Sequence, residues 1–427
     1  MGMTIHMNFK RKILSNGLRV VTVPMKDNPT VTVLVMVEAG SKYETKDING
    51  LSHFLEHMCF KGTEKRPKAS DISSELDGVG ARYNAFTSTE YTGYYAKAEA
   101  RHLDKVLDVI SDMYLHPVFD EKEIEKEKGV ICEEINMYED LPQRKVEEVF
   151  NELLYGDQPA GWSIAGTKDV VRKMTREDFV KYRGKNYLPK ATTLVVSGNF
   201  DEKTIIKKIT TAFKGMPEGR KQTKLKVKEI QTTPQVLVFN KETDQSHIIV
   251  GVRTFDTYSK KRTILSVMSG VLSGGMSSRL FKKLRDEMGV CYYVRAAADL
   301  SSDHGVLAVA AGLDNSRVKV ATEAILNEFK RLKDELVSPE ELIKVKNQMT
   351  GSFTLGLESS DELAEFYAGQ EIYHKELKNP EKLKKEILAI TAEDIRKLAR
   401  EIFKNEKLNL AMVGKGKKED FTEWFKV

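Results

Sequence analysis

The stretch Thr175–Lys181, which reads TREDFVK, recurs 216 residues later as TAEDIRK at Thr391–Lys397. Two further pairs of segments keep the same offset: LVVSG at Leu194–Gly198 with LAMVG at Leu410–Gly414, and VTVLVMV at Val31–Val37 with HIIVGVR at His247–Arg253. Three matches in one register indicate that the chain contains two copies of one folding unit. This duplication decides the fold class, because each half must then build the same kind of core.

Each half mixes short β-branched segments, typical of strands, with amphipathic segments of helical length. Strands are predicted at Leu18–Val23, Val31–Val37, Tyr91–Lys97, Thr192–Ser197, Gln235–Phe239, Ile248–Val252, Tyr292–Ala298 and Val306–Ala310. Helices are predicted around His53 and over Leu103–Leu115, Asp120–Tyr138 and Lys203–Phe213, with counterparts in the second half. Strands separated by more than one helix favour an α+β fold of two homologous α/β sandwich domains over a doubly wound sheet. We place the domains at residues 1–214 and 235–427, joined by a lysine- and threonine-rich linker at 215–234.

The composition is that of an ordinary globular protein, and it excludes several classes. The chain has 427 residues, 41% of them hydrophobic, and a net charge of only +5. Without a basic stripe, nucleic acid is not an expected partner. Neither the first 20 residues nor any later segment has an apolar run long enough for a signal peptide or a membrane span. Three scattered cysteines, Cys59, Cys132 and Cys291, indicate free buried thiols and therefore a cytoplasmic protein. Because no apolar run is long enough, we do not expect it to bind membranes.

The segment His53–His57, which reads HFLEH, has the residue types and spacing of a zinc site. On a helix, His53 and His57 leave the same face one turn apart, so two ring nitrogens can meet one ion. Glu56 can reach a water at the metal, in the residue order of the inverted zincins. The alternative is an ordinary amphipathic helix. A catalytic site needs a third ligand; the glutamate-rich helix Asp120–Ile135 is the expected donor, but spacing alone does not choose among its glutamates.

A wider segment, Gly50–Thr63, reads GLSHFLEHMCFKGT and resembles the signature of the pitrilysin family of zinc peptidases. That family includes insulin-degrading enzyme and the mitochondrial processing peptidase. Its third ligand is a glutamate that follows a Glu-Arg or Glu-Lys pair further along the chain. Glu127-Lys128 precedes Glu134 in this way, so the resemblance implies that Glu134 joins the two histidines to bind one Zn²⁺ per chain. It also implies a supporting role for Glu127. The alternative is that Glu127 is an ordinary surface glutamate.

The second copy lacks these residues. The positions 216 residues beyond the zinc residues hold Ser269, Leu272, Ser273 and Thr350, so no equivalent metal site is expected there. The segments GGMSSRLF and LRDEMGVCY instead resemble the substrate-side block of the family. The resemblance implies that Arg285 and Tyr292 approach the zinc site from the opposite wall, Arg285 holding a substrate carbonyl or carboxylate and Tyr292 donating to the oxyanion. The alternative is a helix-surface arginine and a core tyrosine at the start of a strand.

The segment Gly80–Glu90 contains a further feature of the family. Asn84, Ala85 and Phe86 resemble the start of the Asn-Ala-x-Thr edge strand on which these peptidases hold the substrate. An exposed strand edge binds an extended peptide through main-chain hydrogen bonds with little demand on its sequence, and Asn84 would add side-chain bonds. The alternative for Asn84 is a turn residue that closes a hairpin.

These features predict a zinc endopeptidase that hydrolyses unfolded peptides or small proteins in a closed chamber, with Glu56 as the general base. By the resemblance, the two domains form one half of a clamshell. A homodimer, or a pair with a paralogous subunit, would complete it, with Arg285 and Tyr292 of one subunit serving the zinc of the other. Two alternatives stay open: a targeting-peptide processing enzyme that needs a partner subunit, and a non-catalytic scaffold subunit of the same fold.

Overall fold

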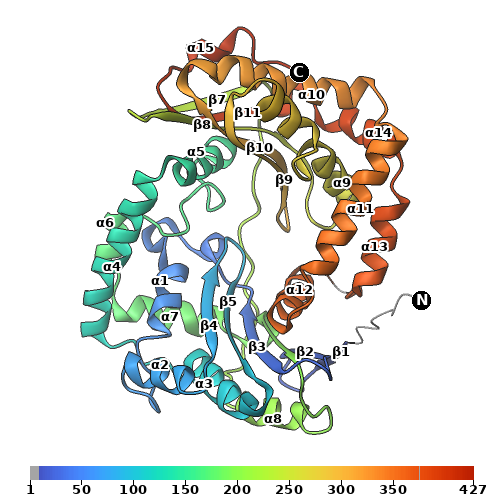
Figure 1. Cartoon of the computed structure of the whole chain (residues 1–427). Coiled ribbons are helices and arrows are strands. Elements are labelled where there is room, and N and C mark those ends of the chain that lie inside the picture. The colour runs from blue at the N-terminus through green and yellow to red at the C-terminus, as the bar shows by residue number, and fades with distance from the viewer. Residues whose placement is uncertain (1–8, 375) are drawn as a thin grey trace. The chain divides into compact units, whose positions relative to one another are not determined.

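The chain folds into two compact units, each built on one β-sheet (Figure 1). The structure is a computed structural model that describes residues 9–374 and 376–427. Unit 1 contains the chain up to Ile135 together with Ser163–Leu225 and Leu355–Pro380. Unit 2 contains Asn136–Trp162, Lys226–Thr354 and Glu381–Val427. Mixed helices and strands in two units confirm the α+β fold expected from the duplicated sequence.

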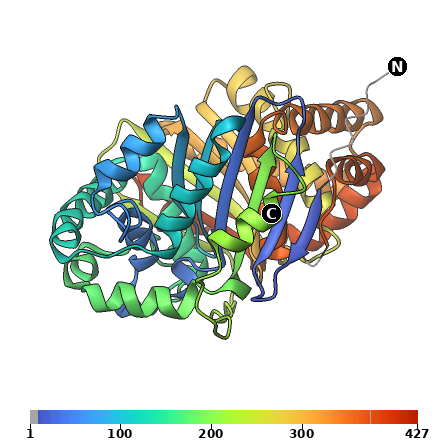
Figure 2. The ribbon, with the colours of Figure 1, turned by 90° about the horizontal axis from the view of Figure 1, so that it is seen from below.

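A six-stranded sheet forms the centre of unit 1, in the order β1-β2-β6-β3-β5-β4. Its strands are β1 (Lys10–Ile13), β2 (Arg19–Pro24), β3 (Thr30–Val37), β4 (Arg82–Thr87), β5 (Thr92–Glu99) and β6 (Thr192–Gly198). Strand β6 runs parallel to β2 and antiparallel to β3, and Figure 2 shows this green strand between the two blue ones. The helices are α1 (Leu51–Met58), α2 (Ala69–Asp77), α3 (Leu103–Leu115), α4 (Glu121–Asp140, which ends in unit 2), α6 (Lys168–Lys173), α7 (Arg176–Asn186), α8 (Ile205–Ala212) and α12 (Ser360–Tyr373).

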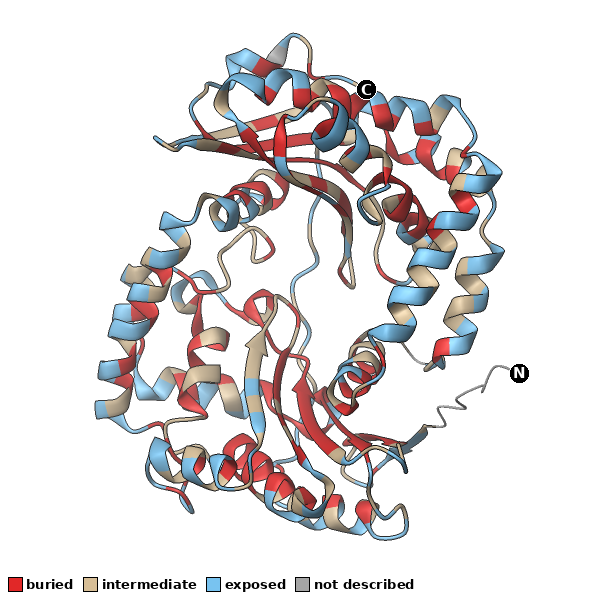
Figure 3. Ribbon diagram, in the orientation of Figure 1, coloured by how far each residue is buried: buried red, intermediate tan, exposed pale blue. Residues whose placement is uncertain are grey.

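Strand β3 is buried on both faces, which explains why its sequence lacks a simple alternation of apolar and polar residues (Figure 3). Val31, Val33 and Val35 join the core to which α3 contributes. Thr32 faces the other side of the sheet, where its hydroxyl lies 2.8 Å from that of Ser360 in α12. The sheet of unit 1 is therefore covered by α3 on one face and by α12 on the other.

Unit 2 repeats this arrangement with a five-stranded sheet in the order β7-β11-β8-β10-β9. Its strands are β7 (Gln235–Asn240), β8 (Gln245–Arg253), β9 (Cys291–Leu300), β10 (Gly305–Asp314) and β11 (Leu408–Gly414). Strand β11 runs parallel to β7 and antiparallel to β8, as β6 does to β2 and β3. Its helices are α5 (Pro142–Tyr155), α9 (Arg262–Ser273), the π-helical η5 (Phe281–Glu287), α10 (Val318–Asp334), α11 (Pro339–Leu355), α13 (Pro380–Ala389), α14 (Ala392–Ile402) and α15 (Glu419–Thr422).

The repeated segment from which the duplication was inferred begins equivalent helices in the two units. The backbone N–H of Thr175, at the start of α7, donates to Asp178 at 2.8 Å. The backbone N–H of Thr391, at the start of α14, donates to Asp394 at 2.9 Å. Both threonines and both aspartates form capping boxes, so the two copies share their helix-start chemistry as well as their strand order.

One helix from each half of the sequence packs in the unit that is formed mainly by the other half. Helix α5 precedes the expected linker, yet Val146, Val149 and Phe150 pack in a core with residues of β8 and β11 in unit 2. Helix α12 follows the linker, yet it packs on β3 and β6 in unit 1. The observed units therefore differ from the predicted boundaries 1–214, 215–234 and 235–427. The amphipathic pattern of a helix shows that one face is apolar but not which sheet that face covers.

Local expectations agree well with the observed elements. Each of the eight predicted strands overlaps an observed one, and α1, α3, α4 and α8 occupy the predicted helical segments. Strand β1 was not predicted, because its residues are charged or exposed and show no burial pattern. The three cysteines are free and buried, as expected. Within residues 9–374 and 376–427, no helix has both the length and the apolar character that a membrane span requires.

Candidate metal centre and active site

Helix α1 presents the two histidines because its other face is held in the core of unit 1. Leu51, Phe54 and Leu55 are fully buried there. His53 and His57 leave the opposite side of the helix, with their ring centroids 4.8 Å apart. The spacing of the HFLEH segment thus places both imidazoles side by side, as the sequence predicts.

Glu134 of α4 meets the two histidines. Its Oε2 lies 3.6 Å from Nε2 of His53 and 3.6 Å from Nε2 of His57. Donor atoms bound at about 2.0–2.1 Å to one tetrahedral ion lie roughly 3.3 Å from each other. All three ligand atoms fall within 4.8 Å of one another, and two imidazoles with one carboxylate form a catalytic zinc donor set. The residues present therefore fit a zinc ion, which His53, His57 and Glu134 would hold.

Glu127 lies at one side of the site, and it is buried rather than exposed on the surface. Its Oε1 is 2.9 Å from Nδ1 of His57, and its Oε2 is 2.5 Å from Nζ of Lys61. Burial alone would raise the pKa of Glu127, but the contacts with His57 and Lys61 outweigh it and lower the pKa. A charged carboxylate at Nδ1 orients the ring of His57 so that Nε2 faces Glu134.

Glu56 is oriented by a residue that sequence reasoning missed. The hydroxyl of Thr87, the last residue of β4, donates a hydrogen bond to Oε2 of Glu56. Burial raises the pKa of Glu56, while this hydrogen bond acts in the opposite direction. The only signal in the sequence was the threonine of the Asn-Ala-x-Thr pattern, whose side chain had been given no role.

Strand β4 forms one edge of the sheet in unit 1, next to β5 alone. Asn84 lies in the middle of this strand and is exposed, so it is not the turn residue of the alternative. Its Oδ1 accepts a hydrogen bond from the N–H of Ala85 at 2.9 Å. The ring of Phe86 lies over Gly93 of β5, where a Cβ would come within 2.3 Å of it. An extended peptide can add to the outer edge of β4.

Arg285 and Tyr292 lie in unit 2 and contact each other through the main chain. The Arg285 guanidinium donates to the carbonyl oxygens of Cys291, at 3.1 Å, and of Tyr292. The Tyr292 side chain is 66% exposed, so it is not the core tyrosine of the alternative. Their proposed approach to the zinc site stays a prediction.

The positions equivalent to the zinc residues serve the backbone of unit 2 instead. The Ser269 hydroxyl donates to the carbonyl of Ala296 at 3.0 Å, and the Ser273 hydroxyl donates to that of Val294 at 3.2 Å. The Thr350 hydroxyl donates to the carbonyl of Lys346 at 2.9 Å. In the second copy, these side chains hold helices and strands in place and present no metal ligands.

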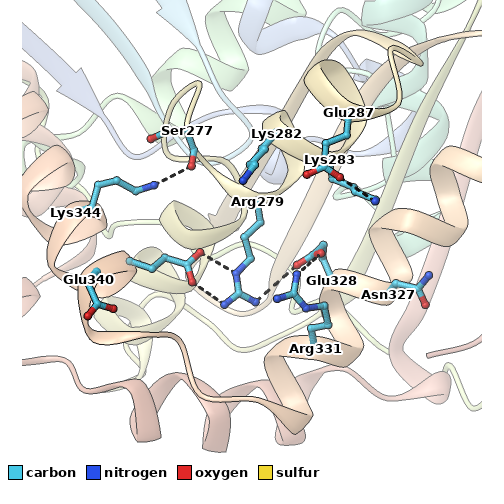
Figure 4. Close-up of a pocket in the computed structure, with 11 residues that line it drawn as sticks. Ser277, Arg279, Lys282, Lys283, Glu287, Asn327, Glu328, Arg331, Glu340 and Lys344 are labelled. Atoms are coloured by element: carbon cyan, nitrogen blue, oxygen red, sulfur yellow. Dashed lines mark hydrogen bonds and ion pairs between the residues drawn. The ribbon is translucent and has the colours of Figure 1, made fainter.

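A pocket of about 610 Å³ in unit 2 is lined by charged side chains (Figure 4). Arg279 donates two hydrogen bonds of 2.8 Å to Glu341, and its Nη1 lies 3.7 Å from Glu328. Glu328 also accepts from Arg331 at 2.8 Å. These ion pairs join the segment before η5 to α10 and α11. They anchor the stretch that leads to Arg285, and we assign the pocket this structural role.

Known protein families and relatives match most of the chain. A family model described as Insulinase (Peptidase family M16) matches residues 19–168, and one described as Peptidase M16 inactive domain matches residues 173–349. The uncharacterized zinc protease YmxG of Bacillus subtilis is 35% identical over 95% of this chain and 98% of its own length. An uncharacterized zinc protease of Streptomyces coelicolor is 30% identical over 95% of this chain and 89% of its own length.

Solved structures share the fold. A protease from Helicobacter pylori superimposes with a TM-score of 0.90 at 24% identity, covering 95% of this chain and 99% of that one. Complex III2 from Candida albicans contains a chain with a TM-score of 0.82 at 18% identity, covering 95% of each chain. The relatives named zinc proteases, together with the His-His-Glu group, place the chain in the class of zinc proteases. The chain belongs to peptidase family M16, the pitrilysin family, which confirms the resemblance found in the sequence.

Proposed function

We propose that this chain is a zinc-dependent endopeptidase that cleaves extended, unfolded peptides. One observation carries the proposal: His53, His57 and Glu134 converge on a single point, and Glu56 on the same helix is oriented by Thr87. A scaffold needs neither three converging ligands nor an oriented carboxylate beside them. The relatives named zinc proteases support the same function.

The chain's own residues supply most of the chemistry. A zinc ion in this site provides the Lewis acid that polarises the scissile carbonyl and lowers the pKa of water. Glu56 accepts the proton of the attacking water and returns it to the leaving amine. The hydrogen bond from Thr87 holds the carboxylate of Glu56 in place for this proton transfer. The outer edge of β4 holds the substrate as an added strand, and so requires an unfolded one.

The test compares wild type with Glu56→Gln on an unstructured fluorogenic peptide, with the zinc content of each protein measured. We expect cleavage by wild type and a loss of roughly 10²–10⁴-fold in the variant, with about one zinc per chain in both. Unchanged cleavage in Glu56→Gln would remove Glu56 from this role. Zinc without cleavage by wild type would favour a targeting-peptide processing enzyme that needs a partner subunit. Neither zinc nor cleavage would favour the scaffold.

The proposal extends to a homodimer that closes a chamber around the substrate. In it, Arg285 of one subunit holds a substrate carbonyl, and Tyr292 of the same subunit donates to the oxyanion at the zinc of the other. Tyr292 suits this role because its side chain is exposed, and one lost oxyanion donor costs roughly 3–4 kcal/mol.

Subunit complementation tests this arrangement. Glu56→Gln and Tyr292→Phe are each expected to be inactive as pure proteins. After unfolding and refolding together, mixed dimers contain one intact site, and about a quarter of the wild-type activity should return. If each zinc is served by its own chain, mixing restores nothing. An active monomer in size-exclusion chromatography would also contradict the dimer.

A further inference from the structure

The two histidines differ in how their second ring nitrogens are held. Nδ1 of His57 bonds to Glu127 at 2.9 Å. Nδ1 of His53 is buried and, in the part of the chain that the structure describes, meets no hydrogen-bond partner. A histidine ligand is usually oriented by a hydrogen bond at its far nitrogen. His53 lacks one, so its position depends on how firmly the backbone of α1 is held.

The start of α1 has an unusual cap. The residue before the helix is Gly50, whose φ of 101° places it in the left-handed region, and it offers no side chain. The carboxylate of Glu44, six residues earlier, takes the place of a capping side chain. It accepts hydrogen bonds from the N–H of Gly50 at 2.8 Å, the N–H of Ser52 at 2.6 Å and Nδ2 of Asn49 at 3.0 Å. Glu44 thus satisfies donors that a helix start otherwise leaves without partners.

Glu44 is almost fully buried, with 3% of its surface exposed. Burial raises the pKa of Glu44, and the hydrogen bonds from Ser52, Gly50 and Asn49 offset that rise only in part. A negative charge at the N-terminus of a helix is stabilised by the helix dipole. A buried carboxylate at this place therefore holds the backbone of Ser52, the residue directly before His53.

Other contacts close the same helix start around Glu44. The hydroxyls of Ser52 and Tyr182 lie 2.7 Å apart, and both groups are buried. A Cβ on Gly50 would come within 2.5 Å of the carbonyl oxygen of Ala165. The backbone before His53 is therefore enclosed on several sides, and Glu44 supplies the carboxylate among these contacts.

We infer that Glu44 is the positioning residue for His53, as Glu127 is for His57, and that it sets the affinity of the site for zinc. The inference rests on the proposed function, since it deepens the same metal site. Glu44 acts through the backbone of α1 without touching the ion: its carboxylate fixes the first helical turn, and the turn fixes Nε2 of His53 opposite Glu134.

Zinc affinity tests this role without any peptide substrate. The dissociation constant for Zn²⁺ would be measured by competition with a chelator for wild type, Glu44→Gln and Glu44→Asp. We expect Glu44→Gln to bind zinc roughly 10–100-fold more weakly, as is typical when a group that orients a ligand is lost. Glu44→Asp keeps the carboxyl group on a shorter side chain and should fall between the two. The visible spectrum of the Co²⁺-loaded proteins should change in the same order, because it reports the ligand geometry.

A matched control separates positioning from general stability. Asp394→Asn removes the equivalent capping carboxylate from α14 in unit 2, whereas the zinc ligands belong to unit 1. It should lower the thermal stability of the zinc-free protein but change zinc affinity by no more than about twofold. An equal loss of affinity in this control would overturn the inference, as would wild-type affinity in folded Glu44→Gln. If Glu44→Gln does not fold, wild-type affinity in Glu44→Asp overturns the inference.

A wild-type chain without zinc affinity would overturn both this inference and the proposed function, whereas wild-type zinc binding without cleavage would count only against the proposed function.

Discussion

The hydroxyl of Thr87 donates a hydrogen bond to the carboxylate of Glu56, which joins the last residue of β4 to helix α1. The two residues are 31 positions apart in the chain. Strand β4 offers the edge on which we propose that the peptide lies, and Glu56 is the proposed base. One hydrogen bond therefore sets the base in a fixed relation to the strand that would hold the substrate.

Thr87→Val removes this hydroxyl at almost constant side-chain volume. We expect kcat to fall roughly 10–100-fold, because a hydrogen bond to a charged group contributes about 1.5–3 kcal/mol. KM and zinc content should change little, since neither the strand edge nor a ligand is altered. Steady-state kinetics on the fluorogenic peptide measure the effect. Thr87→Ser keeps the hydroxyl and should retain most of the activity; equal losses in both variants would show that the methyl group matters instead.

Glu127 and Lys61 should contribute to metal binding in unequal amounts. Glu127→Gln removes the charge beside Nδ1 of His57, and we expect zinc affinity to fall roughly 10-fold or more. Lys61→Met leaves the contact between Glu127 and His57, which measures 2.9 Å, and so should lower affinity less. Chelator competition measures both. If Lys61→Met loses more affinity than Glu127→Gln, the charge of Lys61 rather than the orientation of His57 controls the site.

Features that depend on near neighbours in the chain were predictable from sequence. The HFLEH spacing placed His53 and His57 on one face because a helix repeats every 3.6 residues. The strands were found because β-branched runs suit a buried sheet. Glu134 came from the family resemblance, since spacing alone could not choose it from the other glutamates of α4.

Features that depend on tertiary contacts were not predictable from those patterns. Thr87 reaches Glu56 only because β4 and α1 pack together, and Glu44 caps α1 only because the turns between them bring its carboxylate back. The packing of α5 in unit 2 and of α12 in unit 1 has the same cause. The apolar face of α12, which includes Tyr367, could be buried against either sheet, and the sequence of the helix does not indicate which one. These contacts are set by the three-dimensional fold rather than by a local repeat.

The packing of α12 in unit 1 gives a testable prediction about the boundaries of the units. A fragment ending at Leu225 contains all six strands of unit 1 but lacks α12. Leu363, Tyr367 and Ile372 of α12 are buried, and each contributes roughly 1.5–3 kcal/mol by burial. Their sum is comparable to the whole stability of a typical domain. We therefore expect the fragment to show no cooperative unfolding transition by circular dichroism.

The control for this fragment restores the missing helix. Residues 355–380 joined to the fragment through a flexible linker should recover cooperative unfolding, because they supply the segment that belongs to unit 1. Cooperative unfolding of the fragment without α12 would mean that the helix is dispensable for the sheet. In that case the boundary at 214 predicted from sequence would describe the folding unit better than the packing does.

Lys42 and Glu90 form a buried ion pair of 2.9 Å between the segment before α1 and the turn that follows β4. Burial alone would raise the pKa of Glu90, but the charges of Lys42 and Lys224 outweigh it and hold the pKa at about 2. A glutamate in the unfolded chain titrates near its ordinary value of 4.5. The folded state therefore binds this proton less readily than the unfolded state between these two pH values.

The sign of the effect on stability follows from that difference. The contribution of Glu90 is fully present above about pH 4.5 and is lost as the pH falls towards 2, since protonation then favours the unfolded chain. The difference between the two pKa values corresponds to roughly 3 kcal/mol. Glu90→Gln should lower the free energy of unfolding at pH 7, and the difference from wild type should shrink steadily below pH 4.5.

Urea unfolding at several pH values measures this gap in the free energy of unfolding, and Glu64→Gln, at an exposed position, is the matched control. A gap that stays constant from pH 7 down to about pH 3 would show that Glu90 stabilises the unit through packing rather than through its charge.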